Sequence, residues 1–177
     1  EKPTSGRILF GDDDVTSFLP EHRGVGMVFQ NYALFPLMTI EDNIGFGLKM
    51  KKVPKEEIKK AVKEMMELVH LEGYEKRFPS ELSGGEQQRV SIVRGLINNP
   101  KVLLLDEPLS ALDMKLRKQM QIELKQLQRK FGITFIYVTH SQDEALSMSD
   151  RIVVLNEGKI EQIGTPTQVY ELSLIHI

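Results

Sequence analysis

The chain has 177 residues, with 23 Lys and Arg against 25 Asp and Glu, which gives a formal net charge of −2. This balance argues against a protein that coats nucleic-acid phosphates, because such proteins carry a basic excess. The chain has no Cys, which excludes disulfides and thiolate metal sites. No apolar run approaches the roughly 20 residues that span a bilayer, so we expect a cytoplasmic protein that meets a membrane through a partner.

Hydrophobic patterns along the chain predict an α/β fold. Compact β-rich runs predict short buried strands at residues 7–10, 25–29, 102–105, 134–138 and 151–155. Apolar residues at helical spacing predict helices over residues 55–71 and 114–130. Strands that alternate with helices favour a largely parallel sheet.

The same patterns divide the chain into segments. We expect residues 1–30 to form the first part of the α/β core, and residues 31–81, which lack a convincing strand, to form an inserted helical subdomain. Residues 82–171 are expected to complete the core. The apolar residues 172–177 differ from the polar sequence before them, and we expect a non-native tail there.

The strongest local signal is Asp106-Glu107, which directly follows the apolar run at 102–105. Ligands bind at the carboxyl ends of strands in open α/β sheets. An Asp at that position is suited to hold a Mg²⁺ that bridges nucleotide phosphates, and a Glu beside it is suited to polarise an attacking water. A solvated turn after a strand is the alternative explanation.

A second signal lies upstream, in the sequence Leu-Ser-Gly-Gly-Glu-Gln-Gln-Arg at 82–89. Ser83 and Glu86 have the spacing of a capping box, which predicts a helix that starts at Gly84. Gly84 and Gly85 leave the first amides of this helix open to an anion. An ordinary capped helix would explain Ser83 and Glu86 but not the paired glycines.

Residues 82–89 resemble the signature motif of ATP-binding cassette (ABC) transporter ATPases. Other motifs of this family follow in the same order, over residues 6–171. Gln30 resembles the Q-loop glutamine, and Asp106 and Glu107 resemble the Walker B aspartate and the catalytic glutamate. Residues 110–113 resemble the D-loop, and His140 resembles the switch histidine.

The resemblance implies a fold and a reaction. The fold would be a P-loop NTPase-like (RecA-like) parallel-sheet core, incomplete at the N-terminus, with an inserted helical subdomain. Two copies of the subunit would close head to tail around ATP and Mg²⁺ as a homodimer. The implied roles are catalysis for Glu107 and His140, Mg²⁺ binding for Asp106 and Gln30, and nucleotide binding for Gln30, Ser83, Gly84, Gly85, Gln87 and Asp113.

The chain contains no Gly-x4-Gly-Lys-Ser/Thr sequence, the loop that cradles nucleotide phosphates. Its only Gly-Lys pair, Gly158-Lys159, lies in a predicted hairpin. The family places the phosphate loop before Arg7 and a regulatory β-domain after residue 171. We therefore expect this chain to be inactive by itself and to act as an ATPase only within a full-length protein.

The segment after Gln30 resembles bacterial importers, in which it forms the groove for a transmembrane permease subunit. The resemblance makes Tyr32, Leu34 and Phe35 candidate permease contacts, and packing inside the helical subdomain is their alternative role. Residues 111–130 and 143–151 most resemble spermidine/putrescine importer ATPases, although sugar and glycine-betaine importers share much of this sequence. The expected location is the cytoplasmic face of the membrane, bound to the permease, with an external solute-binding protein as an indirect partner.

Three other classes of protein share parts of these motifs. Chromosome and DNA-repair ATPases insert long coiled coils before the signature motif, whereas Gln30 and Ser83 are close in sequence and no sustained heptads separate them. A translation-associated protein with two cassettes would show a second signature. A catalytically dead subunit is disfavoured by the presence of Glu107, His140 and Asp113.

Overall fold

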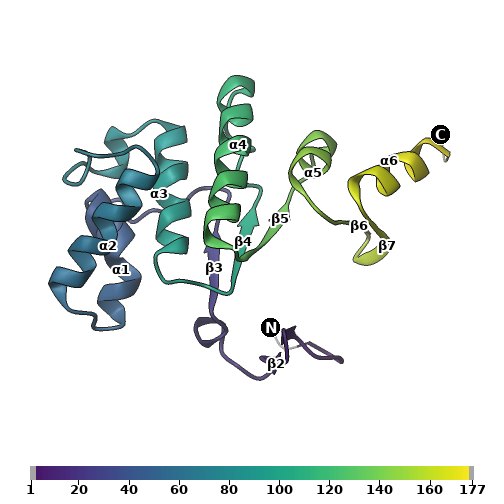
Figure 1. Cartoon of the computed structure of the whole chain (residues 1–177), viewed down its shortest axis with the longest axis horizontal. Coiled ribbons are helices and arrows are strands. Elements are labelled where there is room, and N and C mark those ends of the chain that lie inside the picture. The colour runs from purple at the N-terminus through teal and green to yellow at the C-terminus, as the bar shows by residue number, and fades with distance from the viewer. Residues whose placement is uncertain (1–2, 176–177) are drawn as a thin grey trace.

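The computed structural model describes residues 3–175, and the side chains of residues 3–171. The strands are β1 (Leu9–Phe10), β2 (Asp13–Asp14), β3 (Val25–Val28), β4 (Val102–Asp106), β5 (Thr134–Val138), β6 (Ile152–Asn156) and β7 (Lys159–Gly164). The helices are α1 (Ile40–Met50), α2 (Lys55–Leu68), α3 (Gly84–Leu96), α4 (Met114–Phe131), α5 (Gln142–Met148) and α6 (Pro166–Ile175), with short 3-10 turns at Pro20–His22 and Pro79–Glu81. Strands and helices alternate from α3 to β6, and the rest of the chain holds two hairpins and the helices α1, α2 and α6 (Figure 1).

The centre of the fold is a parallel sheet in the order β3-β4-β5. Its register pairs Val28 with Leu105, and Leu105 with Tyr137. Helices α3 and α4 pack on one face, where Leu103 and Leu105 are fully buried. The parallel α/β core predicted from the sequence is therefore present, because buried apolar strands need helices over them.

The other face of this sheet is open. Met27 is 40% exposed, and Ile136 and Val138 of β5 are 48% and 53% exposed. Met27, Leu104 and Ile136 pair across the three strands, so they form one row on this face. The strands at 102–105 and 134–138 were expected to be buried. Val102, Leu103 and Leu105 are buried, but no residue of β5 is, because helices of the described part of the chain cover one face of the sheet.

The helical subdomain consists of α1 and α2, packed against one side of α3. Its segment 31–81 contains no strand among the described residues, as predicted. Helix α3 belongs to two cores. Ile92 and Leu96 face the sheet, whereas Val90 and Val93 face the subdomain. The helix that begins within the signature motif therefore packs against both the sheet and the subdomain.

Helix ends depart slightly from the sequence prediction. Helix α2 ends at Leu68 rather than at residue 71, because His70 takes a left-handed backbone (φ +56°) and Leu71 N–H returns to the Met66 carbonyl. Helix α4 ends in the expected region, where Gly132 is left-handed (φ +61°) and caps the helix.

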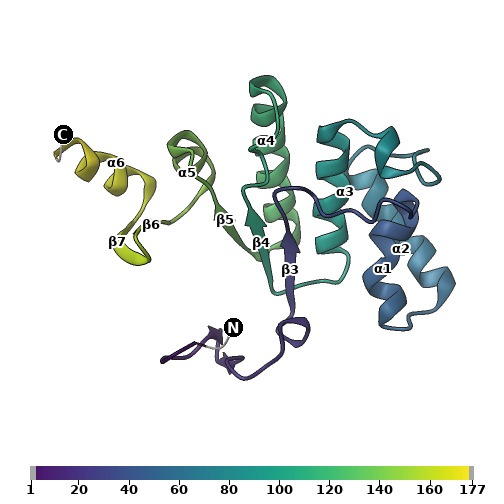
Figure 2. The ribbon, with the colours of Figure 1, turned by 180° about the vertical axis from the view of Figure 1, so that it is seen from behind.

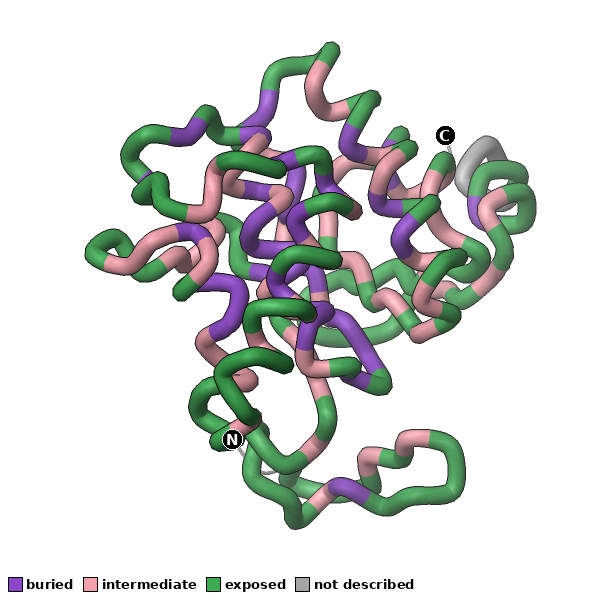
Figure 3. The backbone as a smooth tube through the Cα atoms, turned by 60° about the vertical axis from the view of Figure 1, so that its left-hand side comes forward, coloured by how far each residue is buried: buried purple, intermediate pink, exposed green. Residues whose placement is uncertain are grey.

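The two hairpins, β1–β2 and β6–β7, lie outside the central sheet (Figures 1 and 2). The hairpin predicted around Gly158 is confirmed, with that glycine at φ +77°. Strand β6 was expected to be buried, but Leu155 is 65% exposed because β6 pairs only with β7. Buried positions concentrate in β4 and in helices α1, α3 and α4, and the segment before β3 is mostly exposed (Figure 3).

The backbone of α6 is helical as far as Ile175. Residues 176–177, and the side chains of 172–177, lie outside the described part of the chain, so the non-native tail stays a prediction. Within residues 3–175 no helix combines the length and the apolar character that crossing a membrane requires.

Candidate nucleotide site

The carboxyl ends of β3, β4 and β5 bring three predicted site residues together. Glu107 directly follows β4, and Gln30 and His140 each lie two residues beyond their strands. The Gln30 side-chain amide donates a hydrogen bond of 3.0 Å to Glu107 Oε2. His140 Nδ1 lies 3.3 Å from the same oxygen. One carboxylate oxygen is therefore shared by two residues that are far apart in sequence.

The backbone of Glu107 is held in an uncommon conformation. Its φ is +43°, a region that costs free energy for a residue with a side chain. Its N–H donates to the Val138 carbonyl at 3.0 Å, and its own carbonyl accepts from the Ser110 hydroxyl at 2.9 Å. These bonds fix the direction of a carboxylate that remains 30% exposed, which is the preorganisation that a catalytic base requires.

Asp106 is the last residue of β4 and is half-buried. The described residues contain no group of three or more His, Cys, Asp or Glu side chains that could hold a metal. Mg²⁺ in nucleotide sites takes one or two carboxylates, and water and phosphates supply its other ligands. Asp106, with the oxygen of the Gln30 amide, fits that donor set.

The start of α3 has the geometry that the capping box predicts. Glu86 N–H donates to Ser83 Oγ at 3.4 Å, and Ser83 N–H donates to Glu86 Oε2 at 2.7 Å. The hydrogen bond from the Ser83 hydroxyl lowers the pKa of Glu86. The helix therefore starts at Gly84 as predicted, with an acidic residue in its first turn.

The two signature glycines differ in their surroundings. A Cβ at Gly85 would lie 2.7 Å from the end of the Leu116 side chain, so any larger residue there would force Leu116 to shift. A Cβ at Gly84 would meet only the Tyr32 hydroxyl at 3.5 Å and Leu112 at 3.8 Å. Packing against Leu116 explains why a glycine suits position 85. It does not explain Gly84, where there is room for the close approach of a ligand.

Two predicted nucleotide contacts have structural partners within the chain. The Gln87 amide donates to the carbonyls of Pro79 (3.0 Å) and Leu82 (3.1 Å). Asp113 caps α4 by accepting from two backbone N–H groups of the first turn at 3.0 Å. Both residues position the chain around the motifs, and their contact with nucleotide stays a prediction.

Residues 32 and 33, in the loop after β3, are hydrogen-bonded to side chains of α3. Tyr32 and Ala33 both have left-handed backbones, with φ of 61° and 49°. The Ser91 hydroxyl donates to the Tyr32 carbonyl at 2.9 Å, and the Arg94 guanidinium donates to the carbonyls of Tyr32 and Ala33. The segment after Gln30 is therefore clamped by the same helix that begins with the signature motif.

The three candidate permease contacts are not equivalent. Tyr32 is half-buried, and Leu34 packs against the subdomain core, as the alternative role would have it. Phe35 is 37% exposed, and its ring contacts that of Phe46 in a tilted arrangement, with 4.6 Å between the ring centroids. Sequence reasoning missed Leu37, which is 91% exposed; an apolar residue in the turn after a proline was the available signal.

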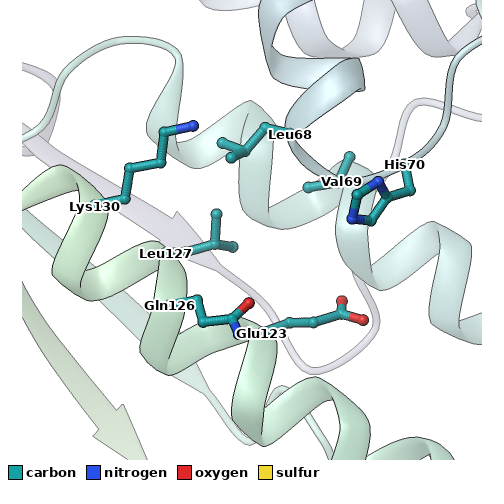
Figure 4. Close-up of a pocket in the computed structure, with 7 residues that line it drawn as sticks. All are labelled: Leu68, Val69, His70, Glu123, Gln126, Leu127 and Lys130. Atoms are coloured by element: carbon teal, nitrogen blue, oxygen red, sulfur yellow. The ribbon is translucent and has the colours of Figure 1, made fainter.

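A separate cavity of about 170 Å³ lies between the end of α2 and α4 (Figure 4). It is lined by Leu68, Val69, His70, Glu123, Gln126, Leu127 and Lys130. None of the residues that the sequence singled out contributes to it, so the cavity is distinct from the candidate site.

The ABC transporter family profile matches residues 1–110, more than half of the chain. The chain belongs to the ABC transporter family, which confirms the family and the fold class inferred from the motifs.

Curated relatives are similar to this chain over nearly its whole length. The spermidine/putrescine import ATP-binding proteins PotA of Acidothermus cellulolyticus and Clostridium novyi are 61% and 59% identical over 97% and 96% of this chain. The match covers 45% and 49% of those proteins, so the chain spans about half the length of the curated relatives it matches.

Solved structures share the fold. The structure of cbiO1 from Clostridium perfringens, part of the ABC transporter complex cbiONQ, is 31% identical with a TM-score of 0.87, over 99% of this chain and 72% of that one. A dimeric ATP-binding cassette in a post-hydrolysis state with ADP and Pi is 33% identical with a TM-score of 0.78, over 94% and 75%.

Proposed function

We propose that this chain is part of the ATP-hydrolysing subunit of an ABC importer for polyamines. The observation that carries the proposal is the shared Glu107 oxygen, which lies within 3.3 Å of both Gln30 and His140 at the ends of parallel strands. The names of the curated relatives support spermidine or putrescine as the solute. Sugar and glycine-betaine importers are the alternatives.

In this proposal Glu107 orients a water molecule and accepts its proton as the water attacks the γ-phosphate of ATP. Gln30 donates to the Glu107 carboxylate and so keeps it aimed, and His140 binds the γ-phosphate side. Asp106 and the Gln30 oxygen would hold Mg²⁺, which neutralises phosphate charge when bound. Positioning and electrostatics supply most of the catalysis in such reactions.

The proposed partners follow from the same assignment. A second copy would present Ser83, Gly84 and Gly85 across the nucleotide, with Gln87 and Asp113 beside it. Transmembrane permease subunits would hold the protein at the cytoplasmic face of the membrane, and an external solute-binding protein would deliver the polyamine to them. The exposed apolar side chains of Phe35 and Leu37 support a permease contact after Gln30.

The decisive experiment replaces Glu107 with Gln in a protein extended to the full length of the relatives. Turnover of ATP should fall roughly 100-fold or more while ATP binding is retained, because the substitution removes the base and leaves Asp106 in place. Near-wild-type turnover would show that Glu107 is not the catalytic base. Uptake of labelled spermidine by the assembled transporter, with maltose and glycine betaine as comparisons, tests the solute.

A further inference from the structure

Glu144 is a buried carboxylate outside the residues used above. It lies in the first turn of α5 and is only 4% exposed. Burying a carboxylate is costly unless charged and hydrogen-bonding partners compensate it, and apolar packing fills such a position at lower cost. The contacts of Glu144 therefore have to explain how a carboxylate is tolerated at this buried position.

The partners of Glu144 come from the end of β5, the loop after it, and α4. Thr139 Oγ1 donates to Glu144 Oε2 at 2.7 Å, and the Tyr137 hydroxyl donates to the same oxygen at 3.0 Å. Burial is the main cause that raises the pKa of Tyr137, so this hydroxyl stays protonated. On the other side, Arg117 Nε lies 3.7 Å from Glu144 Oε1.

Arg117 connects this carboxylate to residues 110–113. Its terminal nitrogen donates to the Leu112 carbonyl at 3.1 Å, directly before Asp113, which caps α4. A continuous set of contacts thus runs from the Leu112 carbonyl through Arg117 and Glu144 to Thr139. Thr139 directly precedes His140 in the chain.

The spacing of Ser141 and Glu144 is that of a capping box, in which the acid would accept from the serine N–H. Only half of this box forms. Glu144 N–H donates to Ser141 Oγ at 3.4 Å, but Ser141 N–H donates to Thr139 Oγ1 at 3.0 Å. The carboxylate instead binds the side chains of Tyr137 and Thr139, which precede His140. Thr139 Oγ1 in turn accepts from the N–H of Ser141, which follows His140.

His140 depends on that anchoring because its own side chain is 74% exposed. We propose that Glu144 is a positioning residue, whose carboxylate ties the backbone around His140 to the Leu112 carbonyl through Arg117 and so presents the imidazole to Glu107. The inference rests on the proposed ATPase function. It adds a link through which a movement at residues 110–113, next to the expected partner copy, changes the placement of His140.

The test is a double-mutant cycle in the full-length protein, with kcat and KM for ATP measured for Glu144→Gln, His140→Ala and the double variant. Glu144→Gln keeps the shape and removes the charge that faces Arg117. It should lower kcat about 10-fold and change KM less than about 2-fold. In the His140→Ala background it should lower kcat by less than about 2-fold further, because both residues act through one imidazole. Equal losses in the two backgrounds would overturn the proposal.

Two more variants keep the test decisive. Thr139→Val removes the same link without touching the buried charge and should reproduce the loss in kcat, so if Glu144→Gln does not fold, full activity of Thr139→Val overturns the proposal. Glu161→Gln, on exposed β7, is the matched control and should leave kcat unchanged. If Glu107→Gln abolishes turnover while Glu144→Gln and Thr139→Val keep wild-type kcat, this inference fails alone. If Glu107→Gln keeps turnover, the proposed function fails with it.

Discussion

The side-chain nitrogen of Gln30 lies 3.0 Å from Glu107 Oε2 and 3.3 Å from the Ser110 hydroxyl. The contact joins the loop after β3 to Glu107, which directly follows β4. It also places the start of the clamped segment at 32–33 directly beside the proposed base. The contact thus connects the proposed base to the segment that leads into the helical subdomain.

Gln30→Ala removes the donor that aims the Glu107 carboxylate. A hydrogen bond to a charged group contributes about 1.5–3 kcal/mol, and 1.4 kcal/mol corresponds to about a tenfold change in rate, so we expect kcat at saturating Mg²⁺-ATP to fall at least about tenfold. Steady-state ATPase rates of the full-length protein check this. The control is Gln126→Ala on the exposed side of α4, and an unchanged kcat for Gln30→Ala would show that the contact does not aim the base.

Leu37→Asp tests the permease contact without disturbing a core. Because Leu37 is 91% exposed, the free energy of unfolding should change by less than about 0.5 kcal/mol, whereas co-purification with the permease should fall about tenfold or more, since a carboxylate would enter an apolar socket. Leu34→Asp is the comparison. Leu34 packs against the subdomain core, so this variant should lose more than about 1 kcal/mol of stability. Normal assembly of Leu37→Asp would locate the contact elsewhere.

Arg89 and Glu123 form a bidentate ion pair between α3 and α4, with distances of 2.9 and 2.7 Å and side chains only 16% and 23% exposed. Arg89→Ala should lower the free energy of unfolding by about 1–3 kcal/mol, because the pair is well oriented and largely shielded from water. The matched control is Lys63→Ala in the exposed Lys63–Glu67 pair of α2, which should change stability by less than about 0.5 kcal/mol. Urea unfolding of both variants makes the comparison, and equal effects would contradict the expectation.

Glu86 should make the stability of the first turn of α3 depend on pH. Its pKa is lowered below the ordinary 4.5, first by the Ser83 hydrogen bond. A depressed pKa means that the stabilisation is present above pH 4.5 and is lost as the pH falls through the lower folded-state value. Glu86→Gln should therefore flatten the loss of stability between pH 5 and the acid limit, measured by urea unfolding at several pH values.

Two variants complete that measurement. Ser83→Ala should cost about 1 kcal/mol near neutral pH, since the helix loses its cap. Glu64→Gln, at an exposed position of α2, should leave the pH profile unchanged. A profile for Glu86→Gln that matches the parent protein would show that this carboxylate does not contribute.

The sequence by itself determined the family, the α/β class, the start of α3 and the order of the motifs. These features depend on local rules. A capping box fixes a helix start through atoms three residues apart, and an apolar run followed by Asp106-Glu107 is a strand with carboxylates at its end. The order of the motifs is read directly along the chain and depends on no contact between distant segments.

Only the tertiary structure decided which faces are covered and which side chains share partners. Met27 lies on the open face of the sheet, whereas Leu34 packs against the subdomain core. Both residues are apolar, but the burial of an apolar side chain depends on which helix lies opposite it. A side chain at position 85 would collide with Leu116, a residue from another helix. The partners of Glu144 come from α4 and β5. Contacts between distant segments are set by packing and strand register, and no local spacing encodes them.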